Sequence, residues 1–305
     1  MCIRDRLSAG RVQTPTLALI VDREEEIRRF VPQEYFTVQA KCRGFTATWR
    51  DRNGQTRTFD RERAEHLCAA LQGKHGVLSE VKRTLRQAPP PAAYDLTELQ
   101  RDANRKYAYS AKETLSLMQS LYERHKLLTY PRTDSRYISD DVVSTLPERL
   151  KSVMVDEYRD LARAILMKRP LQTRFLVDNA RVTDHHAILP TEEQPELFRL
   201  SGPERNIYDL VVRRFLAVLL PPCEYEETRL TLTVGGETFT ARGKIMKEPG
   251  WRAAYGLFLL EEDEEEEGEE REQSLPPLRQ GDSVEVLSAR VSTGKTAPPK
   301  RYTEA

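Results

Sequence analysis

The stretch Gln87-Ala-Pro-Pro-Pro-Ala-Ala-Tyr94 divides the chain into segments of different character. Three consecutive prolines interrupt both helices and central strands, so they mark a domain boundary. On the N-terminal side, alternating apolar residues predict strands over 35–59 and 75–85, joined by a short helix over 61–71. Asn53-Gly54 predicts a tight hairpin turn within the first strand pair.

Helical segments lie on both sides of this boundary. Apolar residues at helical spacing predict a helix within 8–30. Capping boxes at Ser110–Glu113 and Ser201–Glu204 begin helices that are expected to end near His125 and Leu219. Between these two helices the sequence predicts a short strand over 127–130 and helices over 140–155 and 157–168.

After Pro221-Pro222 the chain returns to predicted strands, over 228–234, 237–242 and 282–291. Strand segments thus precede and follow the helical part, which indicates a helical domain inserted into a β-rich one. The predicted fold class is α+β and multidomain.

The charge balance favours a polyanionic partner. The chain has 305 residues, with 48 Lys+Arg against 48 Asp+Glu. Residues 261–272 contain ten acids and one Arg, so the remaining residues have an excess of nine basic side chains. The acidic run is too monotonous for a metal site and predicts a solvated loop, which leaves a basic body that suits nucleic acid.

Composition excludes several classes of protein. The longest apolar run, residues 215–220, is far shorter than the roughly 20 residues that cross a bilayer. The four cysteines are scattered without a CxxC pair, which argues against a zinc ribbon or a disulfide scaffold and favours a reducing compartment. Gly294-Lys295-Thr296 resembles the end of a phosphate-binding loop, but Ala289 occupies the position of the earlier glycine.

The stretch Leu128-Thr-Tyr-Pro-Arg-Thr-Asp-Ser-Arg136 contains the first candidate site. Arg132 lies two positions after Tyr130 and points to the same side in extended geometry. A guanidinium can bind phosphate oxygens and stabilise the charge that develops when a phenol attacks a phosphodiester. Because free tyrosine has a pKa near 10, such a phenol needs a positive environment or a proton acceptor. The alternative is an ordinary buried tyrosine beside a surface arginine.

The stretch Thr183-Asp-His-His-Ala-Ile-Leu-Pro-Thr191 contains the second candidate. Adjacent histidines point apart on a regular element, so His185 and His186 are not expected to chelate one ion together. One histidine directed at a phosphate or a phenol is the functional interpretation. A hydrogen-bonded structural histidine is the alternative.

The third candidate comprises six residues at the start of the first helix: Ser8, Ala9, Gly10, Arg11, Val12 and Gln13. Small residues allow close backbone approach, and helix N-terminal amides favour an anion. Arg11 and Gln13 can contact phosphates or bases. The alternative is a capped helix whose glycine only permits a turn.

Five motifs, in this order, resemble type IA DNA topoisomerases, in particular the bacterial topoisomerase III branch. The resemblance covers nearly the whole chain after Arg6. The motifs are Ser8-Ala-Gly-Arg-Val-Gln-Thr-Pro15, Tyr94-Asp-Leu-Thr-Glu-Leu-Gln100, Thr129-Tyr-Pro-Arg-Thr-Asp-Ser135, Asp184-His-His-Ala-Ile-Leu-Pro-Thr191 and Pro298-Pro-Lys-Arg-Tyr-Thr-Glu-Ala305.

The resemblance implies that Tyr130 cuts one DNA strand and holds its 5′ phosphate as a phosphotyrosine. Arg132 would stabilise the transferring phosphate, and His185, rather than His186, would lie at the same site. Residues 8–13 would contact DNA. Because the phosphotyrosyl ester preserves the bond energy, religation would need no ATP.

The resemblance also implies a ring-shaped protein of three parts. Residues 7–30 and 196–222 would form a helical DNA-binding domain. Residues 31–86 and 223–305 would form a β-rich arch. Residues 87–195 would form a helical lid that carries the catalytic tyrosine and opens to let a strand pass.

Members of this family use Mg²⁺, which is held by an acidic cluster in an N-terminal domain. No segment before Leu7 resembles that domain, so the sequence is expected to be an internal fragment without the metal ligands. Such a fragment would bind single-stranded or underwound DNA without relaxing supercoils. The expected partners are this DNA and a helicase or single-strand binding protein, and the expected location is the bacterial cytoplasm at the nucleoid.

A non-catalytic module that binds single-stranded DNA through basic and aromatic side chains is the alternative function. A tyrosine recombinase or a relaxase is disfavoured. Relaxases need a clustered histidine triad, and five scattered histidines with one adjacent pair do not supply it.

Overall fold

The computed structural model describes residues 10–256 and 273–303, and the chain divides into two compact units. A barrel unit contains the described residues of Met1–Arg83, Thr228–Lys244 and Gly268–Thr303. A helical unit contains those of Thr84–Glu227 and Ile245–Glu267. The sequence predicted this mixture of helices and strands, with strand segments before and after a helical part.

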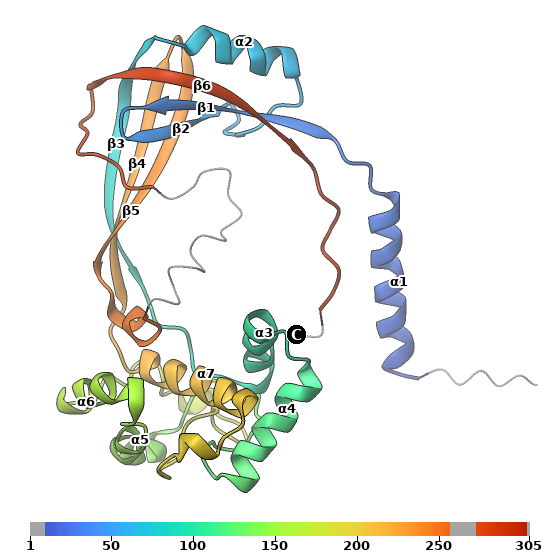
Figure 1. Ribbon diagram of the computed structural model, residues 1–305, viewed down its shortest axis with the longest axis vertical. Helices are drawn as coiled ribbons and strands as arrows, with labels where there is room; N and C mark the ends of the chain where they lie inside the picture. The colour runs from blue at the N-terminus through green and yellow to red at the C-terminus, as the bar shows by residue number, and fades with distance from the viewer. Residues whose placement is uncertain (1–9, 257–272, 304–305) are drawn as a thin grey trace, which may run out of the picture. The chain divides into compact units, whose positions relative to one another are not determined.

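Six strands close into a barrel in the order β1-β2-β5-β4-β3-β6 (Figure 1). Strand β1 pairs antiparallel with both β2 and β6, and the pairs β2–β5 and β3–β6 are also antiparallel. Phe45, Ala47 and Trp49 of β2 are buried in the barrel core, as their alternation predicted. The strands are β1 (Glu34–Cys42), β2 (Phe45–Arg50), β3 (His75–Ala88), β4 (Cys223–Val234), β5 (Glu237–Glu248) and β6 (Ser283–Lys295).

The turn of the first hairpin differs from the prediction. Cys42 pairs with Phe45, so β1 and β2 are joined at Arg43-Gly44, where Gly44 has a φ of 87°. The Asn53-Gly54 prediction is therefore wrong in position. Both glycines adopt a positive φ, which turns require. Asn53-Gly54 forms a separate turn after β2, in which the Gly54 N–H donates to the Asp51 carbonyl over 3.0 Å.

Gly294 has a packing role in β6. It lies opposite Tyr35 of β1, and a Cβ at this position would approach Tyr35 Cζ to 2.4 Å. A side chain here would displace the tyrosine ring. The glycine is thus explained by strand packing, in agreement with the rejection of a phosphate-binding loop.

Helix α1 (Gln13–Arg29) has no buried residue. Its apolar residues Leu17, Leu19 and Ile20 are all exposed, although their spacing is helical as predicted. Polar contacts connect α1 to the C-terminal part of the barrel unit. Arg23 donates to the Lys300 carbonyl and to the Tyr302 hydroxyl, each over 3.0 Å.

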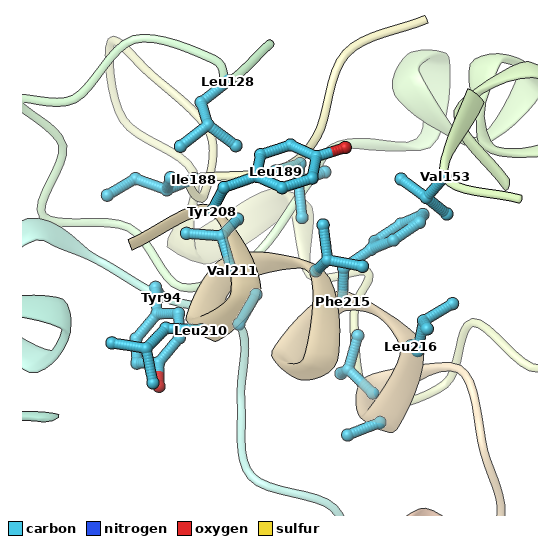
Figure 2. Packing of buried hydrophobic residues seen from close by; sticks show 14 of the residues in the cluster. Tyr94, Leu128, Val153, Ile188, Leu189, Tyr208, Leu210, Val211, Phe215 and Leu216 are labelled. Carbon is cyan, nitrogen blue, oxygen red and sulfur yellow. The ribbon is translucent and has the colours of Figure 1, made fainter. Parts of the chain in front are cut away.

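The helical unit is organised around α7 (Gly202–Val218), which begins at the complete capping box that the sequence predicted. Figure 2 shows Tyr208, Val211 and Phe215 of α7 among other buried residues of the same cluster. The other α-helices are α2 (Arg61–Leu71) in the barrel unit and α3 (Leu96–Tyr107), α4 (Ala111–Gln119), α5 (Leu146–Ser152) and α6 (Arg159–Met167) in the helical unit. A π-helical turn, η1 (Ser120–Arg124), extends α4, and short 3₁₀ turns occupy η2 (Asp140–Thr145), η3 (Asp156–Tyr158), η4 (Asn179–Arg181), η5 (Leu197–Arg199) and η6 (Gly250–Ala254).

A buried polar network joins α3 to α7. Arg214 Nη2 lies 2.6 Å from Asp102 Oδ2, and the Tyr94 hydroxyl donates to the same carboxylate over 2.6 Å. Arg214 also donates to the Ala92 carbonyl and to the Tyr255 hydroxyl. Burial raises the pKa of Tyr94 well above its ordinary value, so its phenol remains a donor. Each nitrogen of the buried guanidinium and both oxygens of the carboxylate have hydrogen-bond partners, as buried charge pairs require.

Two sequence expectations differ from these assignments. The predicted strand over 127–130 is only an isolated bridge between Leu128 and Pro190. The segments 7–30 and 196–222 were expected to share a domain, but α1 is assigned to the barrel unit and α7 to the helical unit. The physical reason is that the buried face of α7 packs on α3, α4 and α6. The three-domain arrangement stays a prediction.

Within residues 10–256 and 273–303, none of the helices combines the length and the apolar character that a membrane span demands.

We predict that Arg214→Ala lowers the free energy of unfolding by about 3–5 kcal/mol, because it removes the buried cation of Asp102 and leaves only the exposed Arg105 paired with this carboxylate. Arg205→Ala is the matched control, since this half-exposed arginine lies 3.6 Å from Asp156 and should change stability by less than about 1 kcal/mol. Urea denaturation of the chain measures both values. Equal effects of the two variants would contradict a structural role of the buried pair.

Candidate active site

Backbone and side-chain hydrogen bonds join the segment before Tyr130 to the segment that contains the two histidines. The Thr129 N–H donates to the Leu189 carbonyl, and the Leu189 N–H donates to Thr129 Oγ1, each over 2.9 Å. The Thr191 N–H donates to the Leu127 carbonyl over 3.0 Å. These bonds join residues 60 or more positions apart, so the two motifs that the sequence singled out are neighbours in space.

The same pairing continues beyond Tyr130 and includes a third motif. Thr133 Oγ1 donates to the His185 carbonyl over 3.1 Å, and the Leu96 N–H donates to the Thr133 carbonyl over 3.1 Å. The Ile188 N–H donates to the Tyr94 carbonyl over 2.8 Å. Three of the five motifs thus meet at one place in the helical unit.

Tyr130 is half-buried between two aromatic side chains. Its ring centroid lies 4.3 Å from that of His185, with an angle of 39° between the planes. Tyr122 approaches edge-on, with centroids 5.6 Å apart and an interplanar angle of 83°. Both contacts restrict the orientation of the Tyr130 ring. The edge-to-face contact with Tyr122 is an arrangement that aromatic pairs prefer.

A pocket of about 270 Å³ opens beside Tyr130. Asp141 and Asp184 bring two carboxylates to its wall, and His185 and His186 bring two imidazoles. The phenol is therefore accessible from a polar pocket rather than sealed in a core.

The two histidines line the same pocket but differ in burial and contacts. His185 is exposed and contacts Tyr130. His186 is half-buried, its Nδ1 lies 2.7 Å from the Ala187 carbonyl oxygen, and burial lowers its pKa. Of the two, His185 is the histidine whose ring contacts the Tyr130 ring, and its catalytic role stays a prediction.

Arg132 is exposed, and it makes no hydrogen bond or ion pair with any residue that the structure describes. The part of the chain that the structure describes also shows no contact between Arg132 and the Tyr130 ring, and the pocket beside Tyr130 is lined by other residues. The guanidinium is thus available to a ligand, and its expected contact with a transferring phosphate stays a prediction.

The third candidate segment lies in the barrel unit. Ser8 and Ala9 lie outside the described residues. Arg11, Val12 and Gln13 are exposed, and α1 begins at Gln13. The Gly10 carbonyl accepts from the Thr14 N–H over 3.2 Å, so Gly10 joins the first helical turn. Contact of this segment with DNA stays a prediction.

Sequence reasoning missed Tyr122 and Asp141. Tyr122 belongs to the apolar face of the helix that follows Ser110, but the π-helical turn η1 shifts its position relative to α-helical spacing. Asp141 lies in η2 and faces the pocket. A hydrogen bond from Ser139 lowers the pKa of Asp141, so this carboxylate is charged at neutral pH.

The described residues do not fit a complete metal centre. No group of three or more His, Cys, Asp or Glu side chains within them is arranged to hold a metal ion. Mg²⁺ prefers several oxygen ligands in octahedral geometry, and two carboxylates line the pocket.

Glu204 anchors the π-helical turn that carries Tyr122. Ser120 Oγ donates to Glu204 Oε1 over 2.6 Å, and the Ser201 N–H and Oγ donate to Glu204 Oε2. Burial alone would raise the pKa of Glu204, but the hydrogen bonds from Ser120 and Ser201 outweigh it and lower the pKa to about 2. The charged carboxylate therefore stabilises the junction between η1 and α7.

A phenol that is accessible from a polar pocket, together with an imidazole and an exposed guanidinium, has the components of a covalent phosphoryl-transfer site. The sequence model of the family described as DNA topoisomerase matches residues 2–305. The chain belongs to this family.

Individual relatives agree with the type IA resemblance and with its topoisomerase III branch. The chain is 49% identical to the proteins named DNA topoisomerase 3 of Bacillus licheniformis and Bacillus subtilis, over 98% of its own length. It matches a crystal structure titled full-length topoisomerase I from Thermotoga maritima with a TM-score of 0.72 and 27% identity, over 97% of this chain.

The chain spans only part of these proteins. It covers 41% of the length of the two Bacillus relatives and 46% of the Thermotoga maritima chain.

We predict that Glu204→Gln lowers the free energy of unfolding at pH 7 by about 2–3 kcal/mol, because the pKa of Glu204 falls from 4.5 in the unfolded chain to about 2 in the folded one. The contribution is fully present above pH 4.5 and is lost as the pH falls towards 2. The difference between wild type and variant should therefore shrink over this interval.

Urea denaturation at a series of pH values measures this difference. Glu113→Gln is the control, because Glu113 is an exposed acid of the neighbouring helix α4 and its substitution should have little effect at any pH. A difference between wild type and Glu204→Gln that stays constant from pH 7 to pH 3 would contradict the assignment.

Proposed function

We propose that the protein acts as a type IA DNA topoisomerase. Tyr130 would cleave one DNA strand, and the enzyme would pass another strand through the break. The observation that carries this proposal is the Tyr130 phenol held against His185 beside a polar pocket, in a chain of the DNA topoisomerase family. Membership in this family supports DNA as the substrate.

In the proposed cleavage step, Tyr130 Oη forms a bond to the scissile phosphorus and the bond from phosphorus to the 3′ oxygen breaks. The phenolic proton is transferred to a base, and the departing 3′ oxygen takes up a proton. His185 is the proposed partner in this proton transfer, since its exposed ring contacts the ring of Tyr130. Religation reverses these steps without ATP, because one phosphodiester is exchanged for another.

The unpaired guanidinium of Arg132 is proposed to bind the non-bridging oxygens of the same phosphate. A planar guanidinium can make two parallel hydrogen bonds to phosphate and is charged at all working pH values. The exposed residues Arg11 and Gln13 are proposed to contact the strand elsewhere, together with Ser8, Ala9, Gly10 and Val12 of the same segment.

Further parts of the proposal come from the family resemblance. Mg²⁺ is proposed to support the full-length enzyme through ligands outside this chain. A helicase or single-strand binding protein is the proposed protein partner, and the bacterial nucleoid is the proposed location. Residues 87–195 are proposed to act as the lid that opens for strand passage.

A topoisomerase needs the Tyr130 hydroxyl oxygen for DNA cleavage, whereas a passive single-strand binding module does not. We predict that Tyr130→Phe abolishes covalent attachment to DNA in a full-length topoisomerase that contains this chain. The affinity for single-stranded DNA should change by less than about twofold, because only the hydroxyl is removed. Denaturing gels of end-labelled oligonucleotide measure cleavage, and fluorescence anisotropy measures binding.

Tyr137→Phe is the matched control, because Tyr137 lies on the same segment and its hydroxyl accepts from Arg181 rather than facing the pocket. It should retain cleavage. Covalent attachment that persists in Tyr130→Phe would refute the proposed nucleophile and leave the binding module as the better account.

We predict that Tyr122→Leu reduces the cleavage rate at saturating DNA by about tenfold, whereas Tyr122→Phe is close to wild type. The edge of the Tyr122 ring restricts Tyr130, and phenylalanine preserves this edge. Single-turnover cleavage measures the rate, and the DNA dissociation constant should be the same in all three proteins. Equal rates for Leu and Phe would show that Tyr122 does not orient the nucleophile.

A further inference from the structure

A second polar pocket, of about 390 Å³, lies in the barrel unit, outside the site around Tyr130. It lies where the end of β2 meets the beginning of β5 and the first turn of α2. Arg50, Arg52 and Arg63 contribute three guanidinium groups to its wall, and Asp51 and Glu237 contribute two carboxylates.

The fold brings these arginines together from three elements. Arg50 ends β2 and is paired with Thr238 of β5, which also lines the pocket. Arg52 lies in the Asn53-Gly54 turn that follows β2. Arg63 lies in the first turn of α2, where its N–H donates to the Asp60 carboxylate over 3.0 Å. Its guanidinium lies 5.2 Å above the centre of the buried Trp49 ring, which limits its freedom.

Both carboxylates of the pocket are engaged by other groups. Asp51 Oδ1 accepts from the N–H of Asn53 over 2.8 Å and from the N–H of Gln55 over 2.7 Å. Glu237 Oε2 accepts from the Trp49 indole N–H over 2.8 Å. The guanidinium groups of Arg52 and Arg63 form no ion pair with any residue within 10–256 and 273–303.

We propose that this pocket binds a phosphate group of a single DNA strand. Arginine forks match the geometry of phosphate oxygens, and one negative charge would balance the excess of three guanidinium groups over two carboxylates. The pocket is lined mainly by polar side chains, and its volume of about 390 Å³ admits a phosphate group. The inference concerns a contact in the barrel unit and does not depend on Tyr130 as the nucleophile.

DNA is the favoured source of the phosphate for two reasons. The chain belongs to a family that acts on DNA. Its body also has an excess of nine basic residues outside the acidic run 261–272. Because this excess alone attracts DNA without a defined site, the test has to separate the pocket from general charge.

The double variant Arg52→Gln/Arg63→Gln removes two pocket cations and leaves Arg50, which bonds within the fold, unchanged. Arg43→Gln is the charge control, because Arg43 is exposed in the β1–β2 turn of the same unit and does not line the pocket. Fluorescence anisotropy with a labelled oligothymidylate, in the 305-residue chain, measures affinity over a series of salt concentrations.

We expect the double variant to bind about tenfold more weakly at low salt, with a log–log salt slope reduced by one to two, and Arg43→Gln to differ from wild type by less than about twofold. Far-ultraviolet circular dichroism reports whether each variant is folded. Equal binding by the folded double variant and the control would overturn the proposal.

Titration with inorganic phosphate, followed by NMR of the arginine Nε–H groups, distinguishes the source. Signals of Arg50, Arg52 and Arg63 that move with both phosphate and oligothymidylate support the proposal. Signals that move with inorganic phosphate while the oligonucleotide leaves them unchanged overturn DNA as the ligand. The Tyr130→Phe chain should give the same shifts, so a failure of the nucleophile assignment is separable from a failure of this one.

Discussion

The hydrogen bonds between residues 127–133 and 185–191 are the interaction on which the candidate site depends. They fix the backbone on both sides of Tyr130 and bring the His185 ring to 4.3 Å from the phenol ring. Neither segment forms a regular strand or helix of its own, so each relies on the other to satisfy its backbone groups. Loss of this pairing would separate the Tyr130 ring from that of His185.

Two kinds of interaction within the helical unit hold these paired segments in place: apolar packing and a buried ion pair. Leu128, Ile188 and Leu189 of the paired segments belong to the apolar cluster that is built around α7 (Figure 2). Apolar contacts alone do not fix how two helices are oriented. The buried pair of Arg214 and Asp102 does so for α7 and α3, because its hydrogen bonds are directional. A reactive side chain on an irregular segment thus acquires a defined position from a rigid scaffold, as functional loops generally do.

Sequence patterns predicted the regular elements well where capping and alternation act locally. The capping box at Ser201–Glu204, the alternation of Phe45 and Trp49 and the helix within 8–30 are all present, since each depends on neighbours within a few residues. The hairpin turn was misplaced because Arg43-Gly44 and Asn53-Gly54 both supply a glycine at positive φ, and only the pairing register selects between them.

The site was predicted in part. Tyr130 was singled out by its residue type beside Arg132, His185 was chosen over His186 by the family resemblance, and the structure brings Tyr130 and His185 together. Tyr122 could not be placed, because a π-helical turn breaks the spacing from which helical faces are read. The pocket of Arg50, Arg52 and Arg63 was also invisible, since its residues come from separate elements that only the closed barrel unites.

The most direct test of the account is to identify the amino acid that becomes linked to DNA. A full-length topoisomerase containing this chain is trapped on a short oligonucleotide by denaturation, digested with protease and nuclease, and analysed by tandem mass spectrometry. The account predicts a nucleotide joined through its 5′ phosphate to the Tyr130 hydroxyl. A nucleotide found on any other side chain, or joined through a 3′ phosphate, would contradict it.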